Sequence, residues 1–285
     1  MSRSNDNGRF FEYLLVQSLL QELDHQCFLN QETIHQNLRD EPKEESIDSD
    51  LLRHFKDNIP KITKWIIRNI NFDLIEIQRL GDDSGKKGDV TDIRLLGENQ
   101  CFNISCKNNN SSIKHQRPGT TFSHLGLTRN EPRSIKFINE YKLINENFYR
   151  KHSQLIPRLS RYNQISEEDK KRDLYEPICD LVRNTLNSMS ERSQFYQDYL
   201  IGNIDYKQIS LMRDHVLIKS FDTIPKTTSM VSSITEKGYV EVEFSNSIIL
   251  RMRLHTASSR ISIGGSLKFD TKVHHIDLKE ETLTL

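Results

Sequence analysis

Two short stretches of alternating residues, 90–96 and 101–107, are separated only by the four residues Gly97-Glu98-Asn99-Gln100. A connection this short, rich in turn-forming residues, predicts an antiparallel β-hairpin. The length of the turn also fixes the register, and a shift of one residue would turn every side chain to the other face. This hairpin therefore constrains the fold more than any other part of the chain.

With Glu98 and Asn99 at the tip, Asp92 falls opposite Ser105. Opposed side chains of an antiparallel pair share a face, and alternation adds Lys107 to that face. The residues between them, Ile104 and Cys106, turn the other way and are expected in a core. A carboxylate and an amine from neighbouring strands thus meet on one side of a sheet.

This arrangement resembles the active site of the PD-(D/E)xK nucleases, in which an Asp begins one strand and an acid-x-Lys lies on the next. In such a site the acid helps to hold Mg²⁺, which polarises the scissile phosphate and lowers the pKa of a bound water. The lysine positions the water and offsets charge on the phosphorus. Here Ser105 stands where the second acid is usual, and a hydroxyl is a poor ligand for Mg²⁺.

A second acid should therefore come from elsewhere. Glu12, on an expected N-terminal helix, is one candidate for the catalytic and metal site. Asp89 is the other, although strand parity places it on the opposite face unless Gly88 breaks the strand. The hairpin alone leaves another interpretation open, a solvent-facing edge with a weak cross-strand charge pair.

The rest of the chain alternates between helical and strand patterns. Helical periodicity is found in residues 8–24, 51–69 and 134–200, the last with polar breaks near 160–170. Strand patterns are found in residues 72–80, 238–244, 248–254 and 267–278, and the turn at 245–247 predicts a second hairpin. Residues 31–50 are acidic and polar and are expected to form a loop or mobile insertion, and residues 81–89 a glycine-rich loop.

This order predicts an α/β fold of the mixed α+β kind, with a central mixed β-sheet flanked by helices and a C-terminal β-rich part. Residues 1–130 would form the nuclease core, with the N-terminal helix and the catalytic hairpin. Residues 131–235 would be a mainly helical DNA-recognition insert, and residues 236–285 a β-rich segment in contact with DNA. The three parts are expected to pack as one continuous compact unit.

Charge is balanced over the 285 residues, with 40 basic and 40 acidic side chains, but it is unevenly distributed. Residues 101–165 hold eleven Lys or Arg and three Glu, whereas residues 31–60 hold eight acids and four bases. A basic stretch suits a surface that contacts phosphates. Chance clustering on a solvated surface is the alternative.

The four cysteines form no C-x-x-C pair, so a zinc ribbon is not expected and reduced thiols are. No apolar run approaches the roughly 20 residues of a membrane span, and the N-terminus has no signal-peptide pattern. The expected location is the cytoplasm.

Longer motifs identify a family. GKKGDVTDIRLL followed by ISCKNNNSSIKHQRPG resembles the HaeIII restriction endonuclease family. NGRFFEYLLV near the start resembles its N-terminal helix, and YLIGNIDYKQISL resembles a segment before its C-terminal region. LRMRLHTASSRI and SLKFD resemble its C-terminal signature. These pieces occur in the family's order over nearly the whole chain.

The resemblance implies a type II restriction endonuclease that uses Mg²⁺ to hydrolyse double-stranded DNA, in a bacterial or archaeal cytoplasm. Members of this type cut GGCC to leave blunt ends. A DNA methyltransferase of matching specificity would belong to the same restriction–modification system without being a physical partner. A palindromic target would favour a homodimer.

The resemblance also implies roles for individual residues. The positions that match the catalytic motifs are Asp89, Asp92, Ser105 and Lys107. The positions in the basic segment, where DNA contact is expected, are Asn108, Lys114, His115 and Arg117. Gln116 and Pro118 depart from the expected pattern there, which bears on the target sequence more than on the chemistry.

A polar group after the strand pattern at 248–254 has two interpretations. It comprises His255, Ser258, Ser259 and Arg260. These side chains donate hydrogen bonds and would suit contacts to base edges or phosphates. They would equally suit a capped turn.

Two other functions remain open at this point. One is a repair or structure-specific nuclease of the PD-(D/E)xK type that cuts without a fixed sequence. The other is a non-catalytic DNA-binding protein of the same fold, which Ser105 would allow. The presence of both Asp92 and Lys107 favours catalysis.

Overall fold

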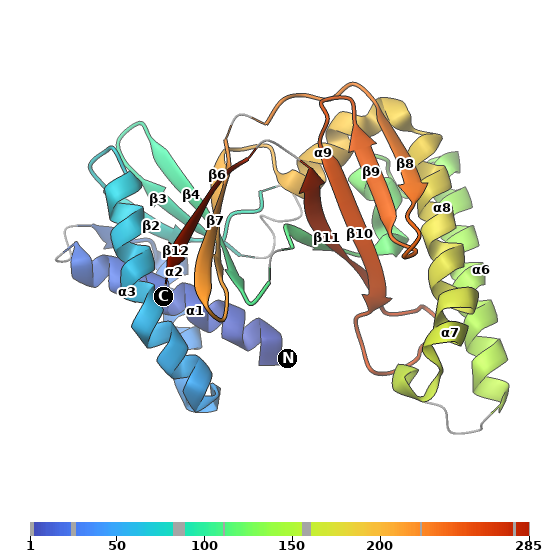
Figure 1. Cartoon of the computed structure of the whole chain (residues 1–285), viewed down its shortest axis with the longest axis horizontal. Coiled ribbons are helices and arrows are strands. Elements are labelled where there is room, and N and C mark those ends of the chain that lie inside the picture. The colour runs from blue at the N-terminus through green and yellow to red at the C-terminus, as the bar shows by residue number, and fades with distance from the viewer. Residues whose placement is uncertain are drawn as a thin grey trace. The chain divides into compact units, whose positions relative to one another are not determined.

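The structure is a computed structural model that describes residues 3–23, 27–81, 89–110, 112–155, 161–222, 224–275 and 278–284. The chain folds into two compact units, which Figure 1 shows coloured along the chain. The first unit holds residues 1–111, 202–224 and 278–285, and the second holds residues 112–201 and 225–277. The two units do not coincide with the three consecutive parts expected from the sequence, because residues 202–224 and 278–285 return to the first unit.

The first unit is built on a mixed sheet of seven strands. The strands are β1 (Phe28–Leu29), β2 (Glu76–Arg79), β3 (Ile93–Leu96), β4 (Cys101–Asn108), β6 (Tyr206–Leu211), β7 (His215–Phe221) and β12 (Lys279–Thr284). Their order is β1-β2-β3-β4-β6-β7-β12. β1 runs parallel to β2 and β4 runs parallel to β6, and the other neighbours are antiparallel.

The predicted hairpin is present as β3 and β4, in the predicted register. Ile93 pairs with Ile104, and Leu96 pairs with Cys101. The turn closes with a 2.9 Å hydrogen bond from the Gly97 N–H to the Gln100 carbonyl. The sequence therefore predicted correctly which residues face one another at the open end of the hairpin.

The helices of the first unit are α1 (Arg3–Glu22), α2 (Gln31–Asp40) and α3 (Ser49–Asn69), with a 3₁₀ turn at Glu41–Ser46. α1 and α3 confirm the helices expected at 8–24 and 51–69. The loop expected at 31–50 is wrong, because α2 and the 3₁₀ turn occupy most of it. Asn30 caps the N-terminus of α2, and its side chain accepts a 2.8 Å hydrogen bond from the Thr33 N–H.

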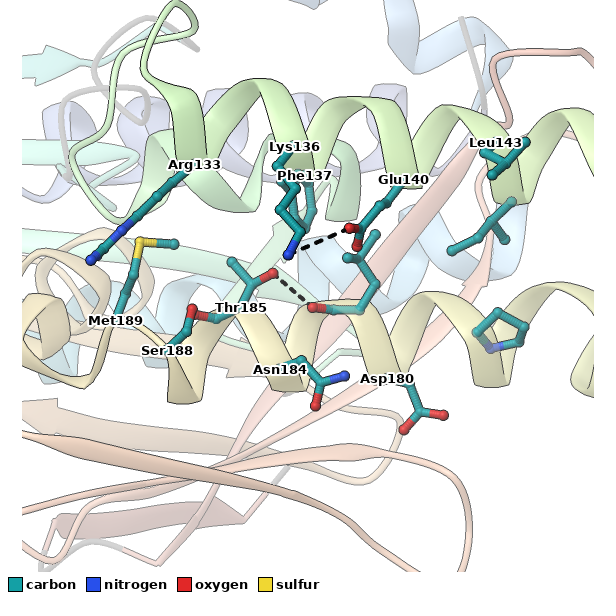
Figure 2. Close-up of a pocket in the computed structure, with 13 residues that line it drawn as sticks. Arg133, Lys136, Phe137, Glu140, Leu143, Asp180, Asn184, Thr185, Ser188 and Met189 are labelled. Carbon is teal, nitrogen blue, oxygen red and sulfur yellow. Dashed lines mark hydrogen bonds and ion pairs between the residues drawn. The ribbon is translucent and has the colours of Figure 1, made fainter.

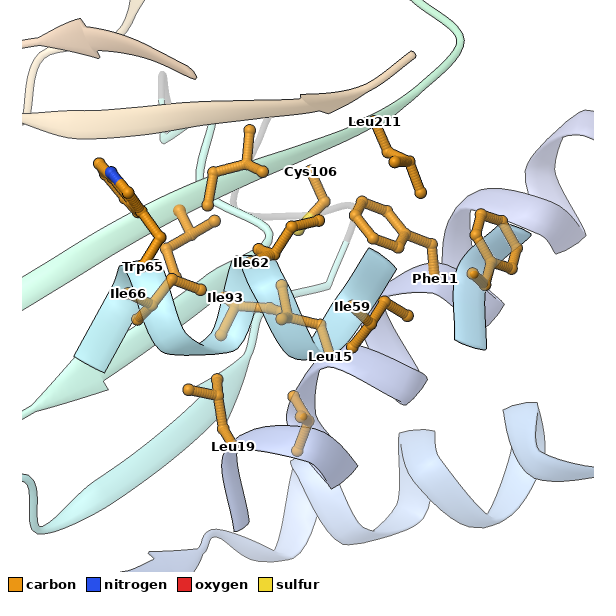
Figure 3. Packing of buried hydrophobic residues seen from close by; sticks show 14 of the residues in the cluster. Phe11, Leu15, Leu19, Ile59, Ile62, Trp65, Ile66, Ile93, Cys106 and Leu211 are labelled. Atoms are coloured by element: carbon orange, nitrogen blue, oxygen red, sulfur yellow. The ribbon is translucent and has the colours of Figure 1, made fainter. Parts of the chain in front are cut away.

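The helices cover the sheet through an apolar core, part of which is drawn in Figure 3. The labelled side chains come from α1, α3 and the strands: Phe11, Leu15, Leu19, Ile59, Ile62, Trp65, Ile66, Ile93, Cys106 and Leu211. Ile104 and Cys106 both belong to this core, as their strand parity predicted. Ser105 and Lys107 alternate with these residues along β4, so they lie on the other face of the sheet.

The second unit combines a five-stranded antiparallel sheet with helices. Its strands are β5 (Lys114–Gln116), β8 (Met230–Ile234), β9 (Val240–Phe244), β10 (Ile249–Thr256) and β11 (Leu267–His275), in the order β5-β11-β10-β9-β8. β9 and β10 form the second predicted hairpin. The helices are α5 (Thr121–His124), α6 (Pro132–Leu155), α7 (Glu167–Lys170), α8 (Glu176–Asn187) and α9 (Ser193–Ile201), with a π-helical turn at Lys171–Tyr175. They confirm the helical region expected at 134–200.

The fold class is confirmed: the chain is mixed α/β, with a large mixed sheet, helices and a β-rich C-terminal region, consistent with a restriction-endonuclease-like fold. In the second unit α6 and α8 lie side by side with a groove between them (Figure 2). Among the helices that the structure describes, none is both long and apolar enough to cross a membrane.

Candidate active site

Asp92 lies directly before β3, and its carboxylate reaches across to β4. Its Oδ2 accepts hydrogen bonds from the Ser105 hydroxyl at 3.1 Å and from the Cys106 backbone N–H at 2.6 Å. The same oxygen lies 3.7 Å from Nζ of Lys107. The Asp92 and Lys107 side chains keep 29% and 22% of their surface exposed. The hairpin thus holds an accessible carboxylate and amine close together.

Glu12 of α1 is the second acid beside this pair. Burial and the charge of Asp92 raise the pKa of Glu12 to about 7, while Arg79 and Lys107 partly oppose the rise. The Glu12 carboxylate is also held by Arg79, because its Oε2 lies 3.1 Å from Nη2 of that residue. Glu12 therefore lies within electrostatic reach of both members of the hairpin pair.

Arg79 of β2 is fully buried and organises the inner side of the site. Besides Glu12, its guanidinium donates to Asn37 Oδ1 at 2.9 Å, to Asp40 Oδ2 at 2.8 Å and to the Arg9 carbonyl at 3.1 Å. A buried charge is tolerated only when it is paired and hydrogen-bonded. These contacts fix the guanidinium, and the guanidinium in turn fixes Glu12.

The sequence patterns above do not single out Arg79, although the sequence contains a signal for it. Strand alternation places Arg79 on the same face as Ile77, and both side chains are buried. A charged residue at a core-facing position of a strand requires a buried partner. The partner lies in α2, because Asp40 is fully buried there.

Asp40 carries the compensating negative charge. Burial alone would raise the pKa of Asp40, but hydrogen bonds from Arg39 and Lys43 and the charge of Arg79 hold it well below its usual range. Asp40 Oδ1 lies 2.9 Å from Nζ of Lys43. The buried face of α2 is therefore polar and helps to neutralise an arginine, while its apolar residues Ile34 and Leu38 are exposed.

Asp89, the alternative second acid, is engaged elsewhere. One carboxylate oxygen lies 2.6 Å from Nη2 of Arg94, and the other accepts a 3.0 Å hydrogen bond from the Thr91 N–H. Most of the glycine-rich loop expected at 81–89 lies outside the described residues. Arg94 shares its strand face with Asp92, so the expectation that Asp89 lies on the opposite face is wrong, but its carboxylate is already bound there. Glu12 instead interacts electrostatically with Asp92 and Lys107.

Several buried polar atoms around the pair have no hydrogen-bond partner among the described residues. They are Thr91 Oγ1, Asn108 Oδ1, the Tyr206 hydroxyl and Gln208 Oε1. Gln208 lies beside Ser105 in the parallel β4–β6 ladder, and burial and then the charge of Asp92 raise the pKa of Tyr206. Buried polar atoms are nearly always satisfied in folded proteins, so those of Tyr206 and Gln208, which share the strand face of Ser105, suit binding of water, a cation or substrate.

The donor set fits Mg²⁺. This cation is usually bound through one or two carboxylates, with waters and substrate phosphates completing its shell. Asp92 and Glu12 supply two carboxylates, and the unsatisfied oxygens nearby could hold waters of the shell. Within the described parts of the chain, no group of three or more His, Cys, Asp or Glu forms a metal site of protein ligands alone.

The basic segment does not present all its side chains on one face. Lys114 and His115 lie on β5, where alternation turns them to opposite faces of the sheet. Nζ of Lys114 donates to the Tyr199 carbonyl at 2.7 Å and lies 3.8 Å from the centre of that ring. His115 Nδ1 instead contacts Asp270 at 2.5 Å on the other face. Lys114 therefore has a structural contact, and His115 is half exposed.

The remaining expected DNA contacts also lie in the second unit. Arg117 is exposed and donates to the Leu267 carbonyl at 3.3 Å. His255 Nε2 contacts Asp270 at 2.9 Å. Of the expected contacts, only Asn108 lies in the first unit with the catalytic candidates.

The loop after β10 has features of a capped turn and keeps its side chains exposed. Ser258 Oγ accepts a 3.1 Å hydrogen bond from the Arg260 N–H, and the Ser259 carbonyl accepts one of 2.9 Å from the Tyr162 N–H. Ser258, Ser259 and Arg260 are all exposed. The backbone is therefore fixed while the side chains stay available, so the DNA contacts expected of them stay a prediction.

Comparison with known proteins gives one match. The HaeIII restriction endonuclease family matches residues 8–235, a range that contains Glu12, the β3–β4 hairpin and all the helices from α2 to α9. No curated protein and no solved structure matches the chain. The family match agrees with the resemblance of the sequence motifs, and it covers most of the 285 residues. The chain belongs to the HaeIII restriction endonuclease family, and it is a nuclease that acts on DNA.

Proposed function

We propose that this nuclease is a Mg²⁺-dependent type II restriction endonuclease that hydrolyses phosphodiester bonds in double-stranded DNA at a short specific site. The target GGCC follows from the family resemblance. The observation that carries the proposal is the meeting of Asp92, Ser105 and Lys107 at the open end of the hairpin. Asp92 and Glu12 are the proposed metal ligands, and Asp89 is the less favoured alternative.

The residues divide the chemistry between them. A divalent cation held there would polarise the scissile phosphate and make a bound water acidic. Oδ2 of Asp92 accepts two hydrogen bonds and faces the Lys107 amine, so the orientation of the carboxylate is set before substrate arrives. Lys107, 3.7 Å away, is placed to orient the attacking water and to offset negative charge on the phosphorus.

Ser105 does not need to be a metal ligand in this scheme. Its hydroxyl donates to Asp92 and so orients the carboxylate. The charge that an acid at this position would supply comes from Glu12, which Arg79 holds in place. We therefore assign Ser105 and Arg79 as positioning residues.

A supercoiled plasmid with known GGCC sites tests the proposal. The chain with Mg²⁺ should give discrete fragments, and EDTA should prevent cleavage. Lys107→Ala and Asp92→Ala should each lower the cleavage rate by at least about 10²-fold, the usual cost of losing one preorganised electrostatic contact. DNA binding should be retained in Lys107→Ala.

A matched control is Lys219→Ala. Lys219 lies on β7 of the same sheet, separated from β4 by β6, and pairs with Glu280 at 2.5 Å. This variant should cut at the normal rate. If Lys107→Ala and Asp92→Ala also cut normally, the site assignment is wrong.

The fragment pattern separates the alternatives. A smear or a preference for junctions would indicate a repair or structure-specific nuclease, and binding without cleavage would indicate a non-catalytic protein. Mapped ends would give the target sequence and the cut position. Resistance of plasmid modified by a GGCC methyltransferase would support the restriction–modification role, and sedimentation analysis with the duplex would show whether a homodimer binds it.

A further inference from the structure

The five-stranded sheet of the second unit has one apolar and one charged face. Met252, Leu254 and Phe269 are buried on the first, and α8 packs beside β8 and β9 (Figure 1). Opposed residues of antiparallel strands share a face, so the intervening positions form the other one. We call this the open face. On β5, β10 and β11, up to the bulge between Ile249 and Leu250, its side chains are His115, Arg251, Arg253, His255, Lys268, Asp270 and Lys272.

The open face carries more bases than acids on these three strands. Four of the seven residues are Lys or Arg and one is an acid, and the neighbouring β9 adds Glu241 and Glu243 to the same face. Arg251 is paired with Glu241 of β9. Arg253 and Lys272 are exposed, and in the described part of the chain neither has a carboxylate partner. Two cations therefore remain available on a solvent-exposed surface.

Asp270 does not neutralise them, although it lies opposite Arg253 in the ladder. Its carboxylate is bound between His115 at 2.5 Å and His255 at 2.9 Å, on the two flanking strands. Burial would raise the pKa of Asp270, but the hydrogen bonds and charges of these histidines hold it well below its usual range. Lys268 is farther away, at 3.9 Å. The carboxylate therefore faces the two histidines, and among the described ion pairs none joins it to Arg253, whose side chain is exposed.

We propose that the open face binds the phosphate backbone of the DNA substrate, with Arg253, Lys268 and Lys272 as contacts. The proposal rests on the function proposed above, which supplies a polyanion as the ligand. An exposed sheet surface with several cations and an already engaged acid complements a row of phosphates. The α6–α8 groove (Figure 2) does not, because its charged lining balances Arg133 and Lys136 against Glu140 and Asp180.

The salt dependence of binding tests this surface. The full chain carrying Lys107→Ala would be titrated against a labelled duplex containing GGCC, over a range of KCl concentrations without divalent cations. Each lost phosphate contact should reduce the slope of log affinity against log salt by about 0.9. Arg253→Gln combined with Lys272→Gln should therefore make the slope shallower by about 1.8.

The control removes the same charge from the helical side of the same unit. Lys142 and Arg150 on α6 are 67% and 68% exposed, and both contact Glu146. Lys142→Gln combined with Arg150→Gln should leave the slope unchanged. Thermal unfolding of both double variants should match that of the parent, since all four side chains are at the surface.

The outcomes separate the two proposals. If the open-face variant changes the slope no more than the control, the surface assignment is overturned, while discrete plasmid fragments would still support the restriction function. If the slope changes but the wild-type chain cuts no DNA, the surface assignment stands and the catalytic one fails. If the parent does not bind the duplex at all, both are overturned.

Discussion

Arg79 and Asp40, which support the candidate active site, are buried and paired, whereas the charged residues on the open face of the second sheet are more exposed and incompletely paired. Arg79 is 1% exposed and contacts two carboxylates, while Arg253 is exposed and has no carboxylate partner in the described residues. Salt screens exposed charges strongly and buried ones weakly. Active-site geometry should therefore be insensitive to salt, and binding through the open face should depend on it.

The largest expected effect comes from breaking the buried network. Arg79→Met leaves Glu12 and Asp40 without their shared partner in a buried site, and should lower the free energy of unfolding by about 3–5 kcal/mol. Urea denaturation measures the change. Adding Glu12→Gln and Asp40→Asn should recover part of the loss, because the unpaired charges cause it.

The matched control is an exposed arginine of the same unit. Arg53 is 73% exposed and lies 3.9 Å from Asp50, so Arg53→Met should cost no more than about 1 kcal/mol. If Arg79→Met and Arg53→Met lower the free energy of unfolding equally, burial does not determine how much each arginine stabilises the fold.

The Arg79 network also shows where sequence patterns stop being informative. The β3–β4 hairpin was predictable because a four-residue turn sets its register locally. The contact of Arg79 with Glu12 joins residues 67 positions apart, and that with Asp40 joins residues 39 apart. Helix α2 is not predicted for the same reason, because its buried face is polar and complements Arg79, which lies on strand β2.

Alternation along β5 determines the sheet face on which Lys114 and His115 lie, but the sequence pattern does not reveal this three-residue strand. DNA contact is predicted for the whole basic segment, but β5 turns Lys114 and His115 to opposite faces. Likewise, residues 202–224 and 278–285 return to the first sheet, a long-range pairing that no local pattern encodes. What the sequence determined well was local: turn length, helical period and strand parity.

The second acid offers the next test within the first unit. Glu12→Gln should lower the cleavage rate by about 10²-fold, because it removes a carboxylate beside Asp92. Asp89→Asn should have a much smaller effect on cleavage, since its carboxylate already binds Arg94 and Thr91. Titration calorimetry with Mn²⁺ in the presence of uncut duplex should show weaker metal binding for Glu12→Gln. The reverse ranking would make Asp89 the ligand.

The second unit also contains a buried basic residue, His124. It shows that burial, and not the unit in which a residue lies, distinguishes the two kinds of charged group. Burial and the charge of Lys114 lower the pKa of His124 from 6.5 to about 3. Between these pH values the unfolded chain binds a proton that the folded chain does not, so the free energy of unfolding falls as pH falls. The slope should be up to about 1.4 kcal/mol per pH unit.

Replacing the imidazole should remove this dependence. His124→Gln should make the free energy of unfolding less sensitive to pH between about pH 6 and pH 4, the window in which the unfolded imidazole is protonated. Urea denaturation at several pH values measures it. A slope as steep as that of the wild type would show that the imidazole is not the group responsible.

The smallest expected effect tests whether pairing on the open face limits binding. Glu241→Gln releases Arg251, which the carboxylate now holds, and should steepen the salt dependence of duplex binding by up to about 0.9. The free energy of unfolding should change by no more than about 1 kcal/mol, because the pair is partly exposed. Glu146→Gln is the matched control: it releases Lys142 and Arg150 on α6, away from the sheet face. If both variants steepen the slope equally, added net charge alone explains the gain, and Arg251 has no particular place on the DNA-binding surface.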